Sequence, residues 1–439
     1  MDEELKLLID AALDGSGQSP VSFEQIETTA RSYAMKFAAQ FIQSAVNADH
    51  SDYVGPFCSC VQCGSPARFG GRKSKLIVTV VGEITFIRAY YVCENCGRGF
   101  YPRDTRLHVD GGSLSEGLTR MIGLTAALVS FKEAAELITS LSGLRIGAKH
   151  IERTAKRLGE LIAADEREHV IEGVSRHSTL YLGMDGTGIP MRPEALKDRR
   201  GKQPDGSAKT REVKLVTVWS ADGKDKTGIP VRDVGSVSYN AAIESAATRD
   251  TDETLSDFAC RVEREATRRG FYQAKRQVII GDGAKWIWNI ADELFPGALQ
   301  IVDLYHAKGN VSTAAKAIFG IESEYGRQWA KSRRDELEGG KIDSVIAALQ
   351  PYAKSHNEAD ACCSYLQANI HRMAYPQFRS QGLCTSSGVV EAGCKLAIGT
   401  RLKRTGMHWS LHGANSIIAL RCCKLSNRYN DYWQRKHAA

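Results

Sequence analysis

The chain has 439 residues, of which 43% are hydrophobic and 25% are charged. These values are ordinary for globular proteins and argue against extensive disorder, while the length exceeds what one hydrophobic core usually organises. No uninterrupted apolar run approaches the roughly 18 residues of a membrane span, and the acidic start Met-Asp-Glu-Glu is unlike a secretory signal. We therefore expect a cytoplasmic protein with several modules and no membrane partner.

Charge is distributed unevenly along the chain. The net charge is +7, from 58 Lys and Arg against 51 Asp and Glu. Residues 1–50 are acidic, whereas residues 392–439 contain nine Lys or Arg against Asp431 alone. Such unevenness says more about binding partners than the total charge does. The last residues, 426–439, are interpreted as a basic tail.

The first segment, residues 1–54, is predicted to be helical. Apolar side chains recur at helical spacing over residues 22–47, which indicates one amphipathic helix leading into the next module. We expect this helix to pack against another element or to dimerise.

Two Cys-x-x-Cys pairs mark the next segment, residues 55–106. Because cytoplasmic thiols stay reduced, regularly spaced cysteines are interpreted as metal ligands. The run between the pairs indicates a β-hairpin that turns near Gly82. This arrangement is typical of a zinc ribbon, in which four thiolates close a tetrahedral structural Zn²⁺ site. The predicted ligands are Cys60, Cys63, Cys93 and Cys96, and Cys58 is a further candidate thiol.

The predicted zinc ribbon carries more basic than acidic residues. Its charged side chains are Arg68, Arg72, Lys73, Lys75, Arg88 and Arg98 against Glu83 and Glu94. This composition fits a face that binds nucleic acid, and it fits a purely structural clip equally well.

Residues 107–175 contain a predicted pair of helices. A helix that begins at Phe131 and a second helix over residues 147–162 are joined by a Gly-containing corner, which is helix-turn-helix spacing. The second helix would then enter the major groove of DNA, although two helices with a Gly turn also occur in other all-α segments. The candidate DNA-binding residues on or near it are Lys149, Arg153, Lys156 and Arg157.

From Thr179 the chain alternates between strands and helices. Strands are predicted over residues 179–184, 213–219, 229–234, 277–280 and 299–302, and helices over residues 254–269 and from Lys285. Three strands on short connections followed by two with helical crossovers predict a mixed sheet. The remaining segments, residues 309–380 and 389–424, show helical patterning.

Three carboxylates stand at element ends in this region. Asp185 and Asp282 each follow an apolar strand, and Glu391 lies at the head of a helix that Ser386 or Ser387 is expected to cap. The carboxyl edge of an α/β sheet is where such folds place their sites. Three converging carboxylates hold divalent metal against phosphate, so phosphodiester chemistry is the first hypothesis. The alternative is that each Asp-Gly is ordinary turn chemistry at a strand end.

Several motifs together resemble a known family. These are Asp-Gly-Thr-Gly on the first strand, Gly-Asp-Gly-Ala before a Trp-containing helix, Asp303-x-x-His306, and Val-Val-Glu before a basic helix. The combination resembles DDE transposases of bacterial insertion sequences, most closely the ISKra-like group. The resemblance implies that Asp185, Asp282 and Glu391 are the catalytic triad and bind Mg²⁺ or Mn²⁺.

The same resemblance implies a fold and partners. The fold would be α/β, with a ribonuclease H-like mixed sheet formed by residues 176–308 and 381–425, a helical insertion over residues 309–380, and the zinc ribbon and helical DNA-binding segment in front. The partners would be double-stranded DNA, as terminal inverted repeats and target DNA, and further copies of the chain on that DNA. A nucleoid-associated location in the cytoplasm would follow.

Other residues are assigned auxiliary roles. Asp303 and His306 match an element that lies near the site in several transposase groups, where His306 would orient a phosphate; a histidine hydrogen-bonded at a helix start is the alternative. In the C-terminal segment, Trp409 is expected to anchor the core rather than stack on a base. The basic residues before it, candidates for phosphate binding, are Arg401, Lys403 and Arg404.

Two other functions remain open from the sequence. A hydrolytic nuclease of the ribonuclease H type would cleave DNA without joining the ends. A transposase-derived DNA-binding protein would keep the carboxylates only as scaffold and would lack metal affinity.

Overall fold

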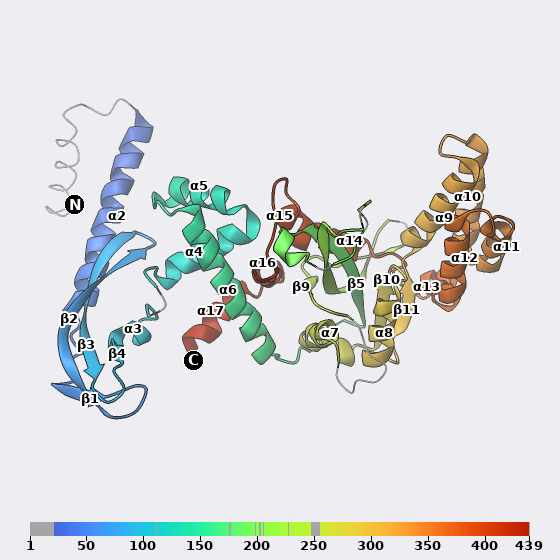
Figure 1. Ribbon diagram of the computed structural model, residues 1–439. Coiled ribbons are helices and arrows are strands. Elements are labelled where there is room, and N and C mark those ends of the chain that lie inside the picture. The colour runs from blue at the N-terminus through green and yellow to red at the C-terminus, as the bar shows by residue number, and fades with distance from the viewer. Residues whose placement is uncertain are drawn as a thin grey trace. The chain divides into compact units, whose positions relative to one another are not determined.

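The structure, a computed structural model, describes residues 22–110, 112–174, 177–197, 199–201, 203–204, 206–226, 228–246 and 255–438. The chain folds into two compact units, Met1–Ala155 and Lys156–Ala439 (Figure 1). Within the described residues, no helix is both long enough and apolar enough to cross a membrane.

The first unit begins with the predicted amphipathic helix, α2 (Phe23–Ala48). Ser22 and Gln25 start it with a reciprocal capping box, which satisfies two backbone donors at the helix start. The C-terminal half of α2 is fastened to a β-hairpin through side-chain amides. Gln43 Oε1 accepts from the Thr85 amide at 2.7 Å, and Asn47 Oδ1 accepts from the Ile87 amide at 2.9 Å.

A four-stranded antiparallel sheet contains the cysteine pairs. Its strands lie in the order β1 (Phe57–Ser59), β2 (Pro66–Thr79), β3 (Gly82–Cys93) and β4 (Gly99–Phe100). The predicted hairpin is confirmed as β2–β3. Its turn needs glycine at position 82, because the φ of 137° there would be strained for any other residue type.

Four helices follow the sheet: α3 (Pro102–Arg106), α4 (Glu116–Leu128), α5 (Phe131–Ser142) and α6 (Ala148–Glu168). The predicted helix pair is therefore present as α5 and α6. Ser130 and Glu133 form the capping box that starts α5, and Gly143 ends it in the left-handed conformation. Helix α6 is longer than predicted and continues into the second unit.

The second unit is built on a five-stranded mixed sheet. Its strands are β5 (Thr179–Pro190), β6 (Thr210–Ser220), β9 (Ser238–Ala242), β10 (Arg276–Gly281) and β11 (Leu299–Val302), in the order β11-β10-β5-β6-β9 (Figure 1). The β5–β6–β9 pairs are antiparallel, whereas β10 is parallel to β5 and to β11. The prediction of a mixed sheet is confirmed.

The predicted third strand is wrong. Residues 230–231 form β8 (Pro230–Val231), which pairs with β7 (Gly223–Lys224) outside the main sheet. The third strand of the sheet is β9, whose sequence Ser-Tyr-Asn-Ala-Ala has neither alternation nor β-branched residues. It is a strand because all of its residues are buried between β6 and helices, so tertiary packing outweighs local propensity.

Helices surround this sheet and form the insertion. Two accompany the strands, α7 (Asp257–Arg268) and α8 (Lys285–Leu294). The insertion is helical as predicted, with α9 (Leu304–Phe319), α10 (Glu324–Glu338), α11 (Ile342–Ala353), α12 (Asn357–Asn369) and α13 (Tyr375–Ser380). The chain ends with α14 (Gly388–Gly393), a π-helical stretch (Cys394–Gly399), α15 (Thr400–Leu402), α16 (Leu411–Leu425) and α17 (Tyr429–Ala438).

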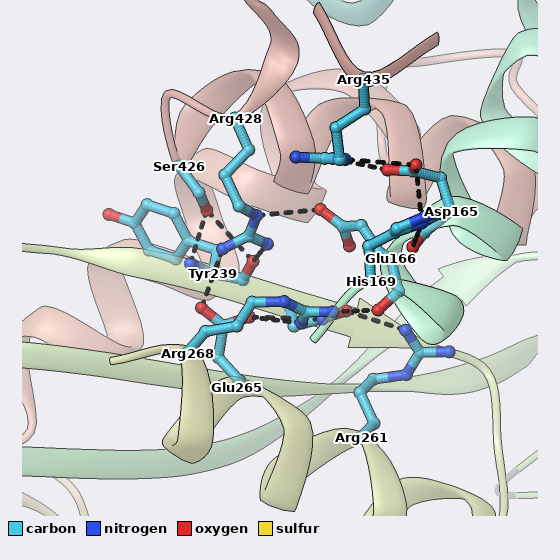
Figure 2. Close-up of polar contacts among 11 residues, drawn as sticks. Asp165, Glu166, His169, Tyr239, Arg261, Glu265, Arg268, Ser426, Arg428 and Arg435 are labelled. Atoms are coloured by element: carbon cyan, nitrogen blue, oxygen red, sulfur yellow. Dashed lines mark hydrogen bonds and ion pairs between the residues drawn. The ribbon is translucent and has the colours of Figure 1, made fainter. Parts of the chain in front are cut away.

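A buried ion-pair network in the second unit joins α6, α7 and the start of α17 (Figure 2). Arg428 donates from Nε to Glu166 of α6 and from Nη1 to Glu265 of α7, both at 2.9 Å. Arg435 of α17 binds Asp165 of α6 at 2.5 Å. Burial opposes the charged form of Arg428, but the carboxylates of Glu265 and Glu166 raise its pKa. The network therefore holds the C-terminal helices to α6 and α7.

We predict that Arg428→Met lowers the free energy of unfolding by about 3–5 kcal/mol, because it leaves buried carboxylates without their partner. Urea unfolding of the full chain, followed by circular dichroism, measures this change. The control Arg327→Met removes an exposed arginine paired with Glu324 and should change stability by less than about 1 kcal/mol.

The same network predicts acid sensitivity. Burial opposes ionisation of Glu265, but Arg428 and Arg268 lower its pKa below the ordinary 4.5. Its stabilisation is therefore present above pH 4.5 and is lost as the pH falls through the lowered folded-state pKa. Wild-type stability should fall in this range, and Arg428→Met should show a weaker dependence; an equally steep dependence in the variant would contradict the assignment.

Candidate functional site

Asp185 lies on β5 at the point where the sheet meets α14. The residue pairs with Leu215 of β6, and its Oδ1 accepts from the Gly186 amide at 2.6 Å. Two residues earlier, Gly183 lets α14 approach the strand, since a Cβ atom there would lie 2.1 Å from Val390 of that helix. The Leu-Gly-Met-Asp sequence thus provides both the carboxylate and the space for the helix beside it.

Asp282 directly follows β10, which is parallel to β5. Its side chain accepts from the Ala284 amide at 2.8 Å, and its carbonyl oxygen accepts from the Tyr365 hydroxyl at 2.8 Å. Gly283 has a φ of 101°, and a Cβ atom there would lie 2.4 Å from the Tyr365 ring. Glycine is therefore required, and α12 of the insertion contacts the loop that holds Asp282.

The structure brings Asp185 and Asp282 together. The pKa of Asp185 is raised, mainly because the side chain is buried and also because Asp282 lies near it. Hydrogen bonds from Cys394 and Gly186, and the nearby imidazole of His306, act in the opposite direction. A carboxylate whose pKa is raised by burial and by a neighbouring carboxylate, as that of Asp185 is, would be stabilised in its ionised form by a cation.

Glu391 lies in the first turn of α14 and is exposed to solvent. It reaches the same neighbourhood through Cys394, which contacts Asp185 and whose pKa is raised by burial, by Asp185 and by Glu391. The side-chain oxygens of the three carboxylates are not gathered within 4.8 Å of one another, unlike two other ligand groups found among the described residues. The carboxylates therefore share one sheet edge without forming a closed cluster.

The expected capping of α14 by a serine side chain is wrong. Ser387 is the N-cap residue, but its side chain makes no cap hydrogen bond, and its φ and ψ of −93° and 23° differ from the extended conformation that such capping uses. Instead, the buried backbone amide of Ser387 donates to Oδ2 of Asp303.

Asp303 and His306 lie at the start of α9. Asp303 is 2% exposed, caps the helix by accepting from the His306 amide at 2.7 Å, and donates its own amide to Gly281 at 2.8 Å. The imidazole of His306 is exposed and close enough to Asp185 to lower the pKa of that carboxyl. Asp303 is thus a positioning residue, and only His306 faces the carboxylates.

In the first unit, the four predicted zinc ligands meet. Sγ of Cys60 lies 3.6 Å from Sγ of Cys96, the same distance separates Cys63 from Cys93, and all four sulfur atoms lie within 4.8 Å of one another. Cys58 is outside this group and packs against the neighbouring apolar cluster. The structure therefore resolves which thiols form the group.

Both cysteine turns have the same backbone conformation. Gly64 and Gly97 follow their cysteine pairs with φ values of 71° and 70°, and each donates its amide to the carbonyl of the first cysteine in its pair, at 3.0 and 2.8 Å. The backbone amide and hydroxyl of Ser65 lower the pKa of Cys63 to about 6. A thiolate at neutral pH is the form that binds metal, so the donor set fits Zn²⁺.

The predicted DNA-binding residues have different exposures. Lys149, Arg153 and Arg157 are exposed on α6, and Lys156 is half-buried. Arg401 is fully buried with its guanidinium over the Trp409 ring, unlike the exposed side chain that its predicted contact with DNA requires.

The other C-terminal residues follow the prediction more closely. Trp409 is buried and donates from Nε1 to the Leu402 carbonyl at 2.9 Å, which confirms that it anchors the core. Lys403 and Arg404 are exposed, and Lys403 donates from Nζ to the Thr187 hydroxyl, two residues beyond Asp185.

The sequence interpretation missed two neighbours of the carboxylates. Cys394 lies three residues after Glu391, a helical spacing that would have placed it on the same face. No sequence spacing indicates Tyr365, because this residue belongs to the insertion. Its hydrogen bond to the Asp282 carbonyl depends on how α12 packs.

Comparisons with known proteins place this chain in a family. The family described as "Uncharacterised protein family (UPF0236)" matches residues 68–427. This chain belongs to the UPF0236 family. One member, the UPF0236 protein in the vanSb 3′ region of Streptococcus gallolyticus, is 21% identical over 372 residues, covering 83% of this chain and 76% of that protein.

Solved structures also match this UPF0236 protein. One of them is the Drosophila P element transposase strand transfer complex, with a TM-score of 0.28 and 10% identity over 76% of this chain and 85% of that chain. A likeness this weak establishes neither the fold nor the function.

We predict that the purified protein contains one Zn²⁺ per chain and that Cys63→Ser removes it, because a structural zinc site needs all four thiolates. Metal analysis by mass spectrometry measures the content, and thermal unfolding should show destabilisation of the variant. Cys58→Ser is the matched control and should retain the metal. Loss of zinc from the control, or its retention in Cys63→Ser, would contradict the assigned ligands.

Proposed function

We propose that this UPF0236 protein is a DNA transposase that cleaves and transfers strands at the terminal inverted repeats of an insertion sequence. The observation that carries the proposal is geometric: Asp185 on β5 and Asp282, directly after the neighbouring parallel strand β10, lie at one sheet edge, and Glu391 lies on α14, which packs against β5. Strand order and direction support a ribonuclease H-like domain, since three antiparallel strands are followed by two parallel strands added beside the first.

The proposed catalytic residues are Asp185, Asp282 and Glu391. Their all-oxygen donor set fits Mg²⁺ or Mn²⁺. Burial, and to a smaller extent Asp282, raises the pKa of Asp185, and a bound cation would favour its ionised form. Bound divalent ions would supply activation of a water or 3′-hydroxyl and stabilisation of the leaving oxygen. The chain itself would fix the geometry of both strands, and Lys403 and His306 would place positive charge or hydrogen-bond donors beside the phosphate.

The first unit and α6 are proposed to bind the terminal repeats. Exposed Lys149, Arg153 and Arg157 on α6 support a helix that contacts DNA, and the zinc ribbon at residues 55–106 would position it. In the proposed domains, residues 107–175 bind DNA, and residues 176–308 together with residues 381–425 catalyse the reaction.

We predict that Asp282→Ala abolishes metal-dependent strand joining and leaves binding of the repeat DNA largely intact, because only the metal-binding edge is altered. A joining assay with Mg²⁺ or Mn²⁺ and labelled end DNA measures the first, and a mobility shift in EDTA measures the second. Glu293→Ala, which removes an exposed carboxylate from α8, is the control and should join normally.

The outcomes of this assay separate the remaining functions. Joining that survives in Asp282→Ala would refute the assigned site. Cleaved ends released without joining by the wild-type protein would instead indicate a hydrolytic nuclease. Tight binding of end DNA without any metal affinity would indicate a DNA-binding protein derived from a transposase.

Assembly on DNA is proposed to use the face of α2 that is exposed among the described residues. Phe23, Phe37 and Phe41 are 75%, 60% and 67% exposed, and they lie on the side of the helix opposite Gln43, which binds the hairpin. Apolar residues that recur every three or four positions line one side of a helix and can form the seam of a two-helix coiled coil. We propose that a second copy of α2 covers the stripe formed by Phe23, Ile26, Ala30, Tyr33, Phe37 and Phe41.

We predict that Phe37→Gln with Phe41→Gln weakens self-association at least about 100-fold, since burying one phenylalanine contributes roughly 1.5–3 kcal/mol. Analytical ultracentrifugation of the full chain over a concentration series measures this. Phe57→Gln removes a ring that is 59% exposed elsewhere in the unit and should leave assembly unchanged. Unchanged assembly with a lower melting temperature in the double variant would show that the stripe is covered within one chain.

A further inference from the structure

A basic hollow opens in the second unit between the loop after β5, the beginning of β6 and the beginning of α8. Its volume is about 1170 Å³. The cationic side chains that line it are Lys197, Arg199, Arg200, Arg211, Lys214 and Lys285. We call this feature the basic hollow. Small-molecule pockets are roughly 300–1,000 Å³ and mostly apolar, so this larger and strongly cationic hollow is unlike one.

The carboxylates in the basic hollow do not neutralise its cations. Glu212 binds Lys214 at 2.8 Å, while Glu244 is held by Arg261, which lies outside the hollow, at 2.9 Å. Within the described part of the chain, no carboxylate lies within ion-pair distance of the other five cations. The hollow therefore presents a concentrated positive charge to solvent.

Crowding of like charges is a further indication of an anionic ligand. Arg211 is half-buried, and burial together with the nearby Arg199 lowers its pKa. The loop that carries Arg199 and Arg200 is held in place by a bridge between Arg200 and Ser207 and by a hydrogen bond from Gly201 to Gly206 at 2.9 Å. Cations fixed side by side repel one another, and a bound polyanion would remove that repulsion.

The basic hollow lies at the same sheet edge as the candidate carboxylates. Lys214 is paired with Gly186, directly beside Asp185, and Lys285 follows Asp282 by three residues. Lys214 lies over the ring of Trp286, on the α8 face of the sheet. On the other face, Gly183 contacts Val390 of α14. A strand that crosses this edge could reach both the carboxylates and the hollow.

We propose that the basic hollow binds the sugar-phosphate backbone of a DNA strand that continues from the scissile phosphate. The cations contact successive phosphates, and the half-buried ring of Trp286 on the wall of the hollow offers a surface on which an unpaired base stacks. The identity of the polymer rests on the proposed transposase function, whereas the affinity for a polyanion rests on the five cations that have no carboxylate partner among the described residues.

The test measures oligonucleotide binding in EDTA, so that it does not depend on catalysis. Arg199→Gln with Arg211→Gln should weaken binding of a single-stranded overhang roughly 25-fold at 0.1 M salt and reduce the slope of log K against log salt by about 1.4, as expected for two lost phosphate contacts. The control, Lys331→Gln with Lys354→Gln, removes two exposed charges from the insertion and should change neither value.

A second double variant shows whether a loss of binding in the first results from misfolding. Arg200→Gln with Lys285→Gln removes a second cation of the same loop together with the cation of α8, and it should give the same losses with a wild-type melting temperature. Wild-type affinity and salt slope in both double variants would overturn the proposal. Binding of inorganic phosphate or a mononucleotide as tight as that of the oligonucleotide, without dependence on chain length, would also overturn it.

The outcome is separable from that of the proposed function. If the wild-type protein does not join strands but its oligonucleotide binding depends on the hollow, the transposase proposal is refuted and the binding-site proposal is supported. If the wild-type protein joins strands and both double variants bind the oligonucleotide as tightly as the wild type, the binding-site proposal is refuted and the transposase proposal is supported.

Discussion

The buried carboxylate of Asp303 is the contact on which the arrangement of the candidate site depends. One oxygen accepts from the amide of His306 at the start of α9, and the other accepts from the amide of Ser387, four residues before Glu391. A buried carboxylate without such donors would be strongly destabilised, so both contacts must form together. The insertion leaves and re-enters the sheet between these two points, and Asp303 thereby fixes where the distant Glu391 segment returns.

Glycines at three positions let α14 and the Tyr365 ring pack close to the segments that carry Asp185 and Asp282. Gly183 on β5 and Gly393 on α14 leave room for Val390 and Leu215, respectively, so α14 lies directly on the strand that carries Asp185. On the other side of the edge, Gly283 leaves room for the Tyr365 ring, whose hydroxyl binds the Asp282 carbonyl. The insertion is therefore part of the support for the second carboxylate.

Features with a local cause could be predicted from the sequence, and features with a tertiary cause could not. Apolar periodicity gave the positions of β10, β11 and the insertion helices, and cysteine spacing gave the thiol group. Strand β9 was missed because Ser-Tyr-Asn-Ala-Ala has neither polar–apolar alternation nor β-branched residues. The proximity of Asp185 and Asp282 could be expected from parallel neighbouring strands, but the contacts of Ser387 depend on Asp303, far away in the sequence.

The same distinction explains why charge along the sequence is a poor guide to where a polyanion binds. Residues 392–439 contain nine Lys or Arg against Asp431 alone, yet Arg421 donates to backbone carbonyls of the π-helical stretch and Arg428 is enclosed by Glu166 and Glu265. Folding thus directs much of that charge inward. The basic hollow instead combines cations from three separate segments, and among the described residues only Lys214 of these cations has a carboxylate partner. An anionic polymer responds to the charge that remains uncompensated after folding, so the hollow is a stronger attraction for it than the C-terminal segment is.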